Sequence, residues 1–303
     1  MHPILFRIPL PNGGHFDIAT YGFMLALGTL AGVFTAMRFT KREGLSSETI
    51  IDLGFWTVIA GVLGAKLWFI IQFWGSVDDK MDLLRNFRSG LVFYGGVVGA
   101  AIVIAWFAKY KRFSILQMLD VAAPSGMLGL AFGRIGCFFN GCCYGVVTNS
   151  SWGVRYPKMV DGDTIVGSPA FIDQLNAGLV HVEDTLSKPA VPTQLIECAS
   201  VLAVFAIVLL LRRGRKFFGE QFTLTLVLYA IVRFSVEFFR GDNEHVLGIL
   251  TIAQVFSIAM FVIGAAGYAY LRGAKPASLA VAGVPAAQAK APEQAKAKGG
   301  KKA

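Results

Sequence analysis

The sequence predicts an all-α polytopic membrane protein of about seven transmembrane helices, with a small head outside the membrane. Of the 303 residues, 55% are hydrophobic and only 16% are charged, which leaves too few polar side chains to cover a water-soluble globule of this length. The hydrophobic residues fall into blocks close to the roughly 20 residues that a helix needs to cross a bilayer. Lys and Arg gather in short loops between these blocks, a pattern typical of membrane proteins.

Seven apolar segments account for most of the chain. They span approximately 18–38, 49–74, 91–108, 116–139, 193–212, 221–239 and 247–271. The fourth segment contains Pro124 and several glycines, which predicts a broken or bent helix that approaches the protein interior. No internal repeat is evident, although many transporters are built from repeats.

Basic residues alternate between the two sides of the predicted membrane. They follow the first, third, fifth and last segments: Arg38, Lys41, Arg42, Lys109, Lys111, Arg112, Arg212, Arg213, Arg215, Lys216, Arg272 and Lys275. Because loops rich in Lys and Arg remain in the cytoplasm, the N-terminus is predicted to be periplasmic and the C-terminus cytoplasmic, in a bacterial inner membrane. Topology therefore explains the net charge of +9 better than nucleic-acid binding does.

Two regions lie outside the apolar segments. The longest polar insertion, about 145–191, falls on the outer side and is predicted to form a small periplasmic head within a membrane domain that covers 1–273. The stretch 274–303 is rich in Ala, Lys and Pro, a composition that predicts a disordered cytoplasmic tail with no part in chemistry.

Ionisable residues inside membrane segments are costly, so each suggests a function. They cluster in two stretches, GRIGCFFNGCCYG at 133–145 and YAIVRFSVEFFRGDNE at 229–244. In the second stretch Arg233, Glu237 and Arg240 are spaced four and three apart, which places them on one helix face. Two arginines at a membrane boundary suit an anionic headgroup, because guanidinium binds phosphate bidentately and stays charged when desolvated.

Other polar residues complete a predicted pocket at the outer leaflet. Arg134 lies between two nearby glycines, and Asn140, Gln194 and Glu197 supply amide and acidic partners from neighbouring segments. The alternative is an internal salt-bridge network that only ties helices together. The excess of Arg over Glu favours binding, because purely structural pairing would balance the charges.

The chain has four cysteines, which are too few for a disulfide scaffold. Three of them lie in CFFNGCC. Cys137, Cys142 and Cys143 are predicted to face the outer side. Three interpretations stay open: two of them form a disulfide, they are free thiols that pack in the interior, or one is a catalytic thiol. A metal site also stays open, although no histidine lies nearby in sequence. The sequence otherwise indicates no metal and no organic cofactor.

Taken in order, these motifs resemble the prolipoprotein diacylglyceryl transferases. The stretch 133–145 resembles the family signature, and YAIVRFSVEFFRGD at 229–242 and AVPTQLIE at 190–197 match two further family motifs. TYGFM at 20–24, GAKLWF at 64–69, FYGGVVGA at 93–100 and TIAQVFS at 251–257 are similar to the remaining ones. The resemblance covers roughly 15–270, and the ordered set is more specific than any single motif.

The resemblance implies a reaction and its partners. The family transfers the diacylglyceryl group of phosphatidylglycerol to the lipobox cysteine thiol in the signal peptide of a preprolipoprotein, and glycerol phosphate leaves. The implied partners are therefore phosphatidylglycerol, these signal peptides and membrane lipids, with no nucleic acid. Arg134 and Arg233 are expected to bind the phosphate and stabilise its departure.

The resemblance also implies roles for the surrounding residues. Arg240 is expected to anchor the headgroup and Glu237 to orient the arginines. Asn140 and Gln194 would donate hydrogen bonds, with Glu197 beside them, and Tyr21 would line the pocket. Lys66 stands where the family usually has an arginine, so it either supplies a charge for phosphate or extends towards the membrane interface.

Three further positions depart from the family pattern. Tyr94 stands in place of a histidine, Cys137 in place of an asparagine and Cys142 in place of a glutamate. Tyr94 is a candidate catalytic base, but its ordinary pKa near 10 suits that role only if neighbouring arginines lower it; His245 is the first substitute. Two alternatives thus stay open: a divergent relative that uses another acceptor, and a non-catalytic lipid-binding or transport protein.

Overall fold

The computed structural model describes residues 3–9, 11, 15–75, 80–81, 92–161, 164–165, 167–241, 245–247 and 250–274. Apart from residue 274, the predicted tail 274–303 lies outside the described residues, as does the side chain of His245. The long helices are α1 (Thr20–Glu43), α2 (Ser47–Phe73), α4 (Phe93–Tyr110), α5 (Ile115–Asn140), α7 (Thr193–Leu211), α8 (Glu220–Glu237) and α9 (Ile252–Gly273). Each of the seven coincides with a predicted apolar segment.

Five of these helices are long and apolar enough to cross a membrane: α1, α2, α5, α7 and α9. The apolar part of α4, Tyr94–Tyr110, is shorter than they are. α8 carries three charged residues, Glu220, Arg233 and Glu237, and is correspondingly less apolar. The prediction of a mostly helical membrane protein is therefore confirmed, with five candidate spans in the described part of the chain.

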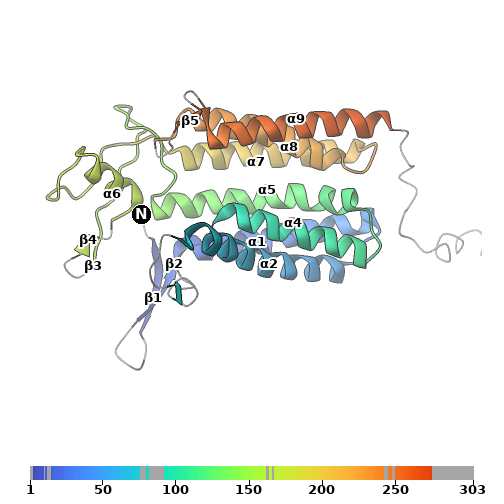
Figure 1. Cartoon of the computed structure of the whole chain (residues 1–303), viewed down its shortest axis with the longest axis horizontal. Helices are drawn as coiled ribbons and strands as arrows, with labels where there is room; N and C mark the ends of the chain where they lie inside the picture. The colour runs from blue at the N-terminus through green and yellow to red at the C-terminus, as the bar shows by residue number, and fades with distance from the viewer. Residues whose placement is uncertain are drawn as a thin grey trace, which may run out of the picture.

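The helices form a bundle around α5. Figure 1 shows α7, α8 and α9 on one side of α5 and α1, α2 and α4 on the other. α1 packs along α5, α2 along α4, and α8 along α9, while α7 and α8 both contact α5. A close backbone approach joins α2 to α4, because a side chain on Gly95 would collide with the carbonyl oxygen of Gly64.

α5 remains one helix through Pro124, so the predicted break does not occur. Proline cannot donate to the carbonyl four residues earlier, which here belongs to Asp120. Arg212 Nη1 donates to that carbonyl oxygen at 2.8 Å. A side chain from the segment after α7 thus satisfies the acceptor that Pro124 leaves open.

Short strands and one short helix lie at one end of the bundle (Figure 1). β1 (Ile4–Pro9) pairs antiparallel with β2 (His15–Ala19), β3 (Val160–Asp161) with β4 (Thr164–Ile165), and β5 (His245–Leu247) with β6 (Leu250–Thr251). The stretch between α5 and α7, which the sequence predicts to be a head, contains β3, β4 and α6 (Pro169–Asn176). The all-α prediction did not include these three two-stranded ribbons.

A buried ionic network holds the other end of the bundle. Arg215 pairs with Glu43 at 2.8 Å and with Asp120 at 3.3 Å, and Arg212 pairs with Glu43 at 2.6 Å. The Asp120 carboxylate also accepts from the backbone N–H groups of Gly219 and Phe222, at 2.7 and 2.9 Å. The network joins the end of α1, the start of α5, the segment after α7 and the start of α8.

We expect Asp120→Ala to lower the free energy of unfolding by about 3–5 kcal/mol, because it leaves Glu43 as the one carboxylate that balances the two buried guanidinium groups of Arg212 and Arg215. It also removes the acceptor at the start of α8. Thermal unfolding of the purified protein in detergent measures the effect. Asp52→Ala, at an exposed position on α2, serves as the control, and equal unfolding temperatures for the two variants would contradict this account.

Candidate functional site

Several helix ends lie at the end of the bundle that carries the short strands (Figure 1). Among them are the beginnings of α1 and α7 and the ends of α5 and α8. The loops beyond α5 and α8 also touch, because Gly145 forms a β-bridge with Arg240 and Val146 N–H donates to the Phe239 carbonyl at 2.9 Å. Both motifs that concentrate charge in the sequence are therefore brought to one place.

Arg134 and Glu197 form a buried ion pair between α5 and α7. Arg134 Nη2 lies 2.8 Å from Glu197 Oε1, and the two side chains are 13% and 2% exposed. The Tyr229 hydroxyl of α8 donates to the same carboxylate oxygen at 3.4 Å. Arg134 Nε is buried and has no hydrogen-bond partner among the described residues. One donor of this guanidinium is thus left for a ligand.

Arg233 forms a second buried ion pair within α8. Its Nη1 lies 2.6 Å from Glu237 Oε2, and the side chains are 15% and 1% exposed. The other Glu237 oxygen accepts from Thr251 Oγ1 at 2.6 Å, which ties the end of α8 to the first residue before α9. The positive charges of Arg134 and Arg233 both act on Tyr229, so both arginines lie near this residue.

Gln194 and Asn140 hold the loop that follows α5. Gln194 Nε2 donates to the Cys142 carbonyl at 2.8 Å, and its amide also bonds the Tyr156 hydroxyl. Asn140 forms a side-chain hydrogen bond with the Cys142 thiol. The sequence predicts both amides as donors to a substrate, whereas the structure engages them within the protein.

Tyr21 and Arg240 border the same region. The Tyr21 ring lies against Gly136, where an added Cβ would come within 3.0 Å of Tyr21 Cδ2. Gly136 therefore allows α1 and α5 to approach closely at this point. Tyr21 and Arg240 both act electrostatically on the cysteines at the end of α5.

Lys66 and Tyr94 come from the α2–α4 pair. Lys66 is 3% exposed, and its ammonium lies 5.1 Å from the centre of the Phe69 ring, so it does not extend along the surface. Tyr94 is 44% exposed and packs its ring against Phe256 of α9 at a centroid distance of 5.3 Å. Tyr94 thus lies where α4 approaches the beginning of α9.

Three cysteines gather at the end of α5. Cys137, Cys142 and Cys143 are free, and their sulfur atoms all lie within 4.8 Å of one another. Hydrogen bonds with the Cys137 and Cys142 thiols lower the pKa of Cys143, and the positive charges of Arg240 and Arg134 lower it further. The thiols therefore belong to the same electrostatic environment as the arginines.

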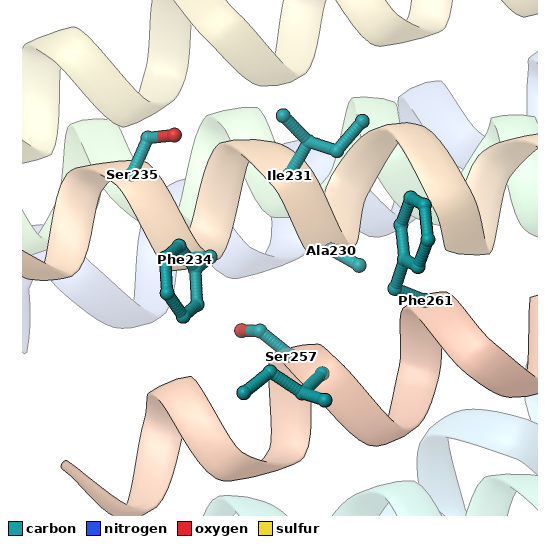
Figure 2. A pocket seen from close by; sticks show the side chains of 7 residues that line it. Ala230, Ile231, Phe234, Ser235, Ser257 and Phe261 are labelled. Carbon is teal, nitrogen blue, oxygen red and sulfur yellow. The ribbon is translucent and has the colours of Figure 1, made fainter. Parts of the chain in front are cut away.

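An apolar pocket of about 240 Å³ opens between α8 and α9 beside this region. In Figure 2, Phe234 and Ala230 of α8 face Ser257 and Phe261 of α9 across the pocket. The pocket shares helix α8 with the buried guanidinium group of Arg233, although Arg233 is not among the residues that line it. Such an arrangement can accept an apolar chain attached to a charged group.

Sequence reasoning missed three residues of the site. Tyr229 lies four residues before Arg233, a helical spacing that would have placed it on the same face. Thr251 precedes Gln254 by three residues, the pattern of a capping box, which the structure contains. Tyr156, in the polar head, gave no signal in the sequence.

Comparison with known proteins gives one consistent result. The model of the family described as prolipoprotein diacylglyceryl transferase matches residues 3–270. The phosphatidylglycerol–prolipoprotein diacylglyceryl transferase of Clostridium tetani (strain Massachusetts / E88) is 32% identical over 267 residues, which cover 87% of this chain and 95% of that protein.

Two further relatives agree. The phosphatidylglycerol–prolipoprotein diacylglyceryl transferase 2 of Clostridium perfringens (strain 13 / Type A) is 31% identical over 85% of this chain and 93% of its own length. The enzyme of that name from Staphylococcus saprophyticus is 31% identical over 86% of each chain. With a match that extends over nearly its whole length, the chain belongs to the prolipoprotein diacylglyceryl transferase family.

Proposed function

We propose that this protein transfers the diacylglyceryl group of phosphatidylglycerol to the lipobox cysteine thiol of preprolipoproteins. The observation that carries the proposal is the buried Arg134 guanidinium, whose Nε lacks a partner among the described residues. A buried donor without an acceptor is unfavourable, and a phosphate oxygen would satisfy it. The names of the relatives supply the two substrates.

The arginines would act on the phosphate. In the reaction the acceptor sulfur attacks the glycerol carbon, the bond between that carbon and the phosphate oxygen breaks, and glycerol phosphate leaves with the bonding electrons. Negative charge therefore grows on the departing phosphate. Arg134 and Arg233 supply fixed positive charge in a water-poor site, where such stabilisation is strongest, and Arg240 would anchor the headgroup from the neighbouring loop.

The acidic residues would position these arginines. Glu197 holds Arg134 at 2.8 Å and Glu237 holds Arg233 at 2.6 Å. Thr251 in turn holds Glu237. Because the geometry is fixed before the lipid arrives, little reorganisation is needed as the transition state forms.

Lipid transfer also needs room for acyl chains. The pocket between α8 and α9 is apolar and shares helix α8 with Arg233, and we propose that it holds an acyl chain of a lipid whose headgroup lies on the arginines. Tyr21 and Lys66 would complete the region around the lipid. The role of Tyr94 as the catalytic base stays a prediction. Its ring packs on Phe256 of α9.

Family membership favours this reaction over the two alternatives. A divergent acceptor or a non-catalytic lipid binder would not require both substrates that the names of the relatives specify. The ion pairs of Arg134 and Arg233 alone would also suit a protein that binds lipid without chemistry. Family membership, together with the Arg134 Nε that lacks a partner among the described residues, favours the transfer reaction.

The proposal includes a topology in the bacterial inner membrane. α4 and α8 would cross together with the five longer helices, since α4 packs on α2, and α8 on α9 and α5. With seven crossings and the basic loops in the cytoplasm, the site end and the head 145–191 would lie in the periplasm. The ionic network of α1, α5 and Arg212 would then lie near the cytoplasmic face, beside basic loops.

We expect Arg134→Ala to reduce diacylglyceryl transfer by about 10²–10³-fold, because it removes a donor to the departing phosphate. Purified protein is incubated with phosphatidylglycerol and a lipobox peptide, and the release of glycerol phosphate and the mass gain of the peptide are measured. Arg213→Ala, at an exposed arginine beyond α7, is the matched control. Full activity of the Arg134 variant would refute its assigned role.

We expect Ile258→Trp to raise the KM for long-chain phosphatidylglycerol several-fold and to spare a short-chain lipid, because the larger ring narrows the pocket. Ile258 lines the pocket and is 45% exposed, so the fold should tolerate the change. Ile263→Trp, at an exposed position further along α9, is the control. A parallel change for both lipids would show that the pocket holds no acyl chain.

Reporter fusions test the topology. Green fluorescent protein, which becomes fluorescent in the cytoplasm, is expected to fluoresce when fused after Gly273. Alkaline phosphatase, which is active only in the periplasm, is expected to be active when fused at Gly178 in the head. A dark fluorescent protein after Gly273 together with an inactive phosphatase at Gly178 would contradict this topology. That outcome would require an even number of crossings or an inverted bundle.

A further inference from the structure

The thiols at the end of α5 form the one reactive cluster, among the described residues, that the proposed phosphate chemistry does not use. We propose that Cys137, Cys142 and Cys143 bind one soft divalent cation of the zinc class and leave its fourth coordination position open. The three sulfur atoms already lie within 4.8 Å of one another. Three thiolates are a donor set that such ions prefer.

The observed spacing needs little adjustment. Zinc–sulfur bonds of about 2.3 Å in a tetrahedral site place the sulfur atoms about 3.8 Å apart. A contraction of at most about 1 Å between any two sulfur atoms therefore suffices. A disulfide explains the convergence less well, because it joins only two of the three thiols and the vicinal pair Cys142–Cys143 would be strained.

The loop that carries the thiols is held in place from outside. Thr193 Oγ1 donates to the Cys143 carbonyl at 2.7 Å, and Gln194 Nε2 donates to the Cys142 carbonyl at 2.8 Å. Cys143 adopts φ of +58°, a left-handed conformation that is unfavourable for a side-chain-bearing residue. Strain of this kind persists where the surroundings fix it and is concentrated at ligand sites.

The electrostatic surroundings suit a site with net negative charge. Three thiolates around a divalent ion carry a net charge of −1, and the guanidinium groups of Arg240 and Arg134 act on Cys143. Cys137 is buried, whereas Cys142 and Cys143 are partly exposed. Two ligands thus face a region that a fourth ligand from outside can reach.

An open fourth position has a use in the proposed function, on which this step rests. The acceptor of the reaction is itself a thiol, and coordination to a cation removes its proton. The lipobox sulfur would release its proton to solvent on binding. It would then attack the glycerol carbon, and the electrons of the broken carbon–oxygen bond would leave with the phosphate. The cluster would thereby activate the thiol where Tyr94 replaces the family histidine.

Metal binding is measured first, independently of activity. The full chain in detergent is reduced, stripped with a chelator and titrated with zinc chloride or cadmium chloride. Elemental analysis is expected to find one ion per chain, and cadmium to produce the ultraviolet charge-transfer band of thiolate ligation. Cys137→Ser, Cys142→Ser and Cys143→Ser are each expected to weaken binding more than about tenfold.

Cys198→Ser is the matched control, because Cys198 is a free, buried thiol on α7 that packs with Ala131 and Val201, outside the cluster. It is expected to leave both the stoichiometry and the band unchanged. Failure of the reduced wild-type chain to bind either ion overturns the proposal, even if a serine variant does not fold. So does a disulfide between two cluster cysteines in freshly isolated, metal-free protein.

Activity then separates this inference from the proposed function. If the stripped chain transfers diacylglyceryl at the full rate, activation of the acceptor by the ion is overturned and the proposed function stands. If the chain binds the ion but transfers no lipid under any metal condition, the site stands and the proposed function fails. Loss on stripping with recovery on adding zinc supports both.

Discussion

Burial of charge without access to water is the constraint on which this structure depends. A charged side chain inside a membrane protein is stable only when it is paired and hydrogen-bonded. The bundle satisfies this condition at both ends, and α5 takes part in both, through Asp120 at one end and Arg134 at the other. The two ends differ in one respect. At the Asp120 end the carboxylates accept from several donors, whereas at the Arg134 end a guanidinium donor stays free.

The lengths of the apolar blocks were enough to predict the helices, and each of the seven long helices coincides with an apolar segment. Their ends were less predictable, because contacts from distant parts of the chain determine them. α1 continues to Glu43, beyond the apolar residues, where Glu43 pairs with Arg212 and Arg215. α9 begins five residues later than predicted, since Thr251 and Gln254 form a capping box before it. Strands β3 to β6 have only two or three residues each, too few to leave a periodic signal. β1 and β2 are longer but mostly exposed, and their burial does not alternate along the strand.

The candidate site was predictable to the extent that local spacing encodes it. The pair Arg233 and Glu237 follows from a four-residue spacing on one helix. The pairing of Arg134 with Glu197 joins residues 63 positions apart in number, and only the packing of α5 on α7 brings them together. For the same reason the engagement of Gln194 with the loop carbonyl of Cys142 could not be predicted.

The pairing of Arg134 with Glu197 has a consequence for turnover. A guanidinium without a counter-ion in a low-dielectric site would hold a phosphate very strongly, including the one that must depart as product. Glu197 offsets part of that positive charge before any lipid arrives. The site would thereby bind the phosphate through direction and fit more than through charge alone, and a small anionic product could escape once its link to the membrane lipid is cut.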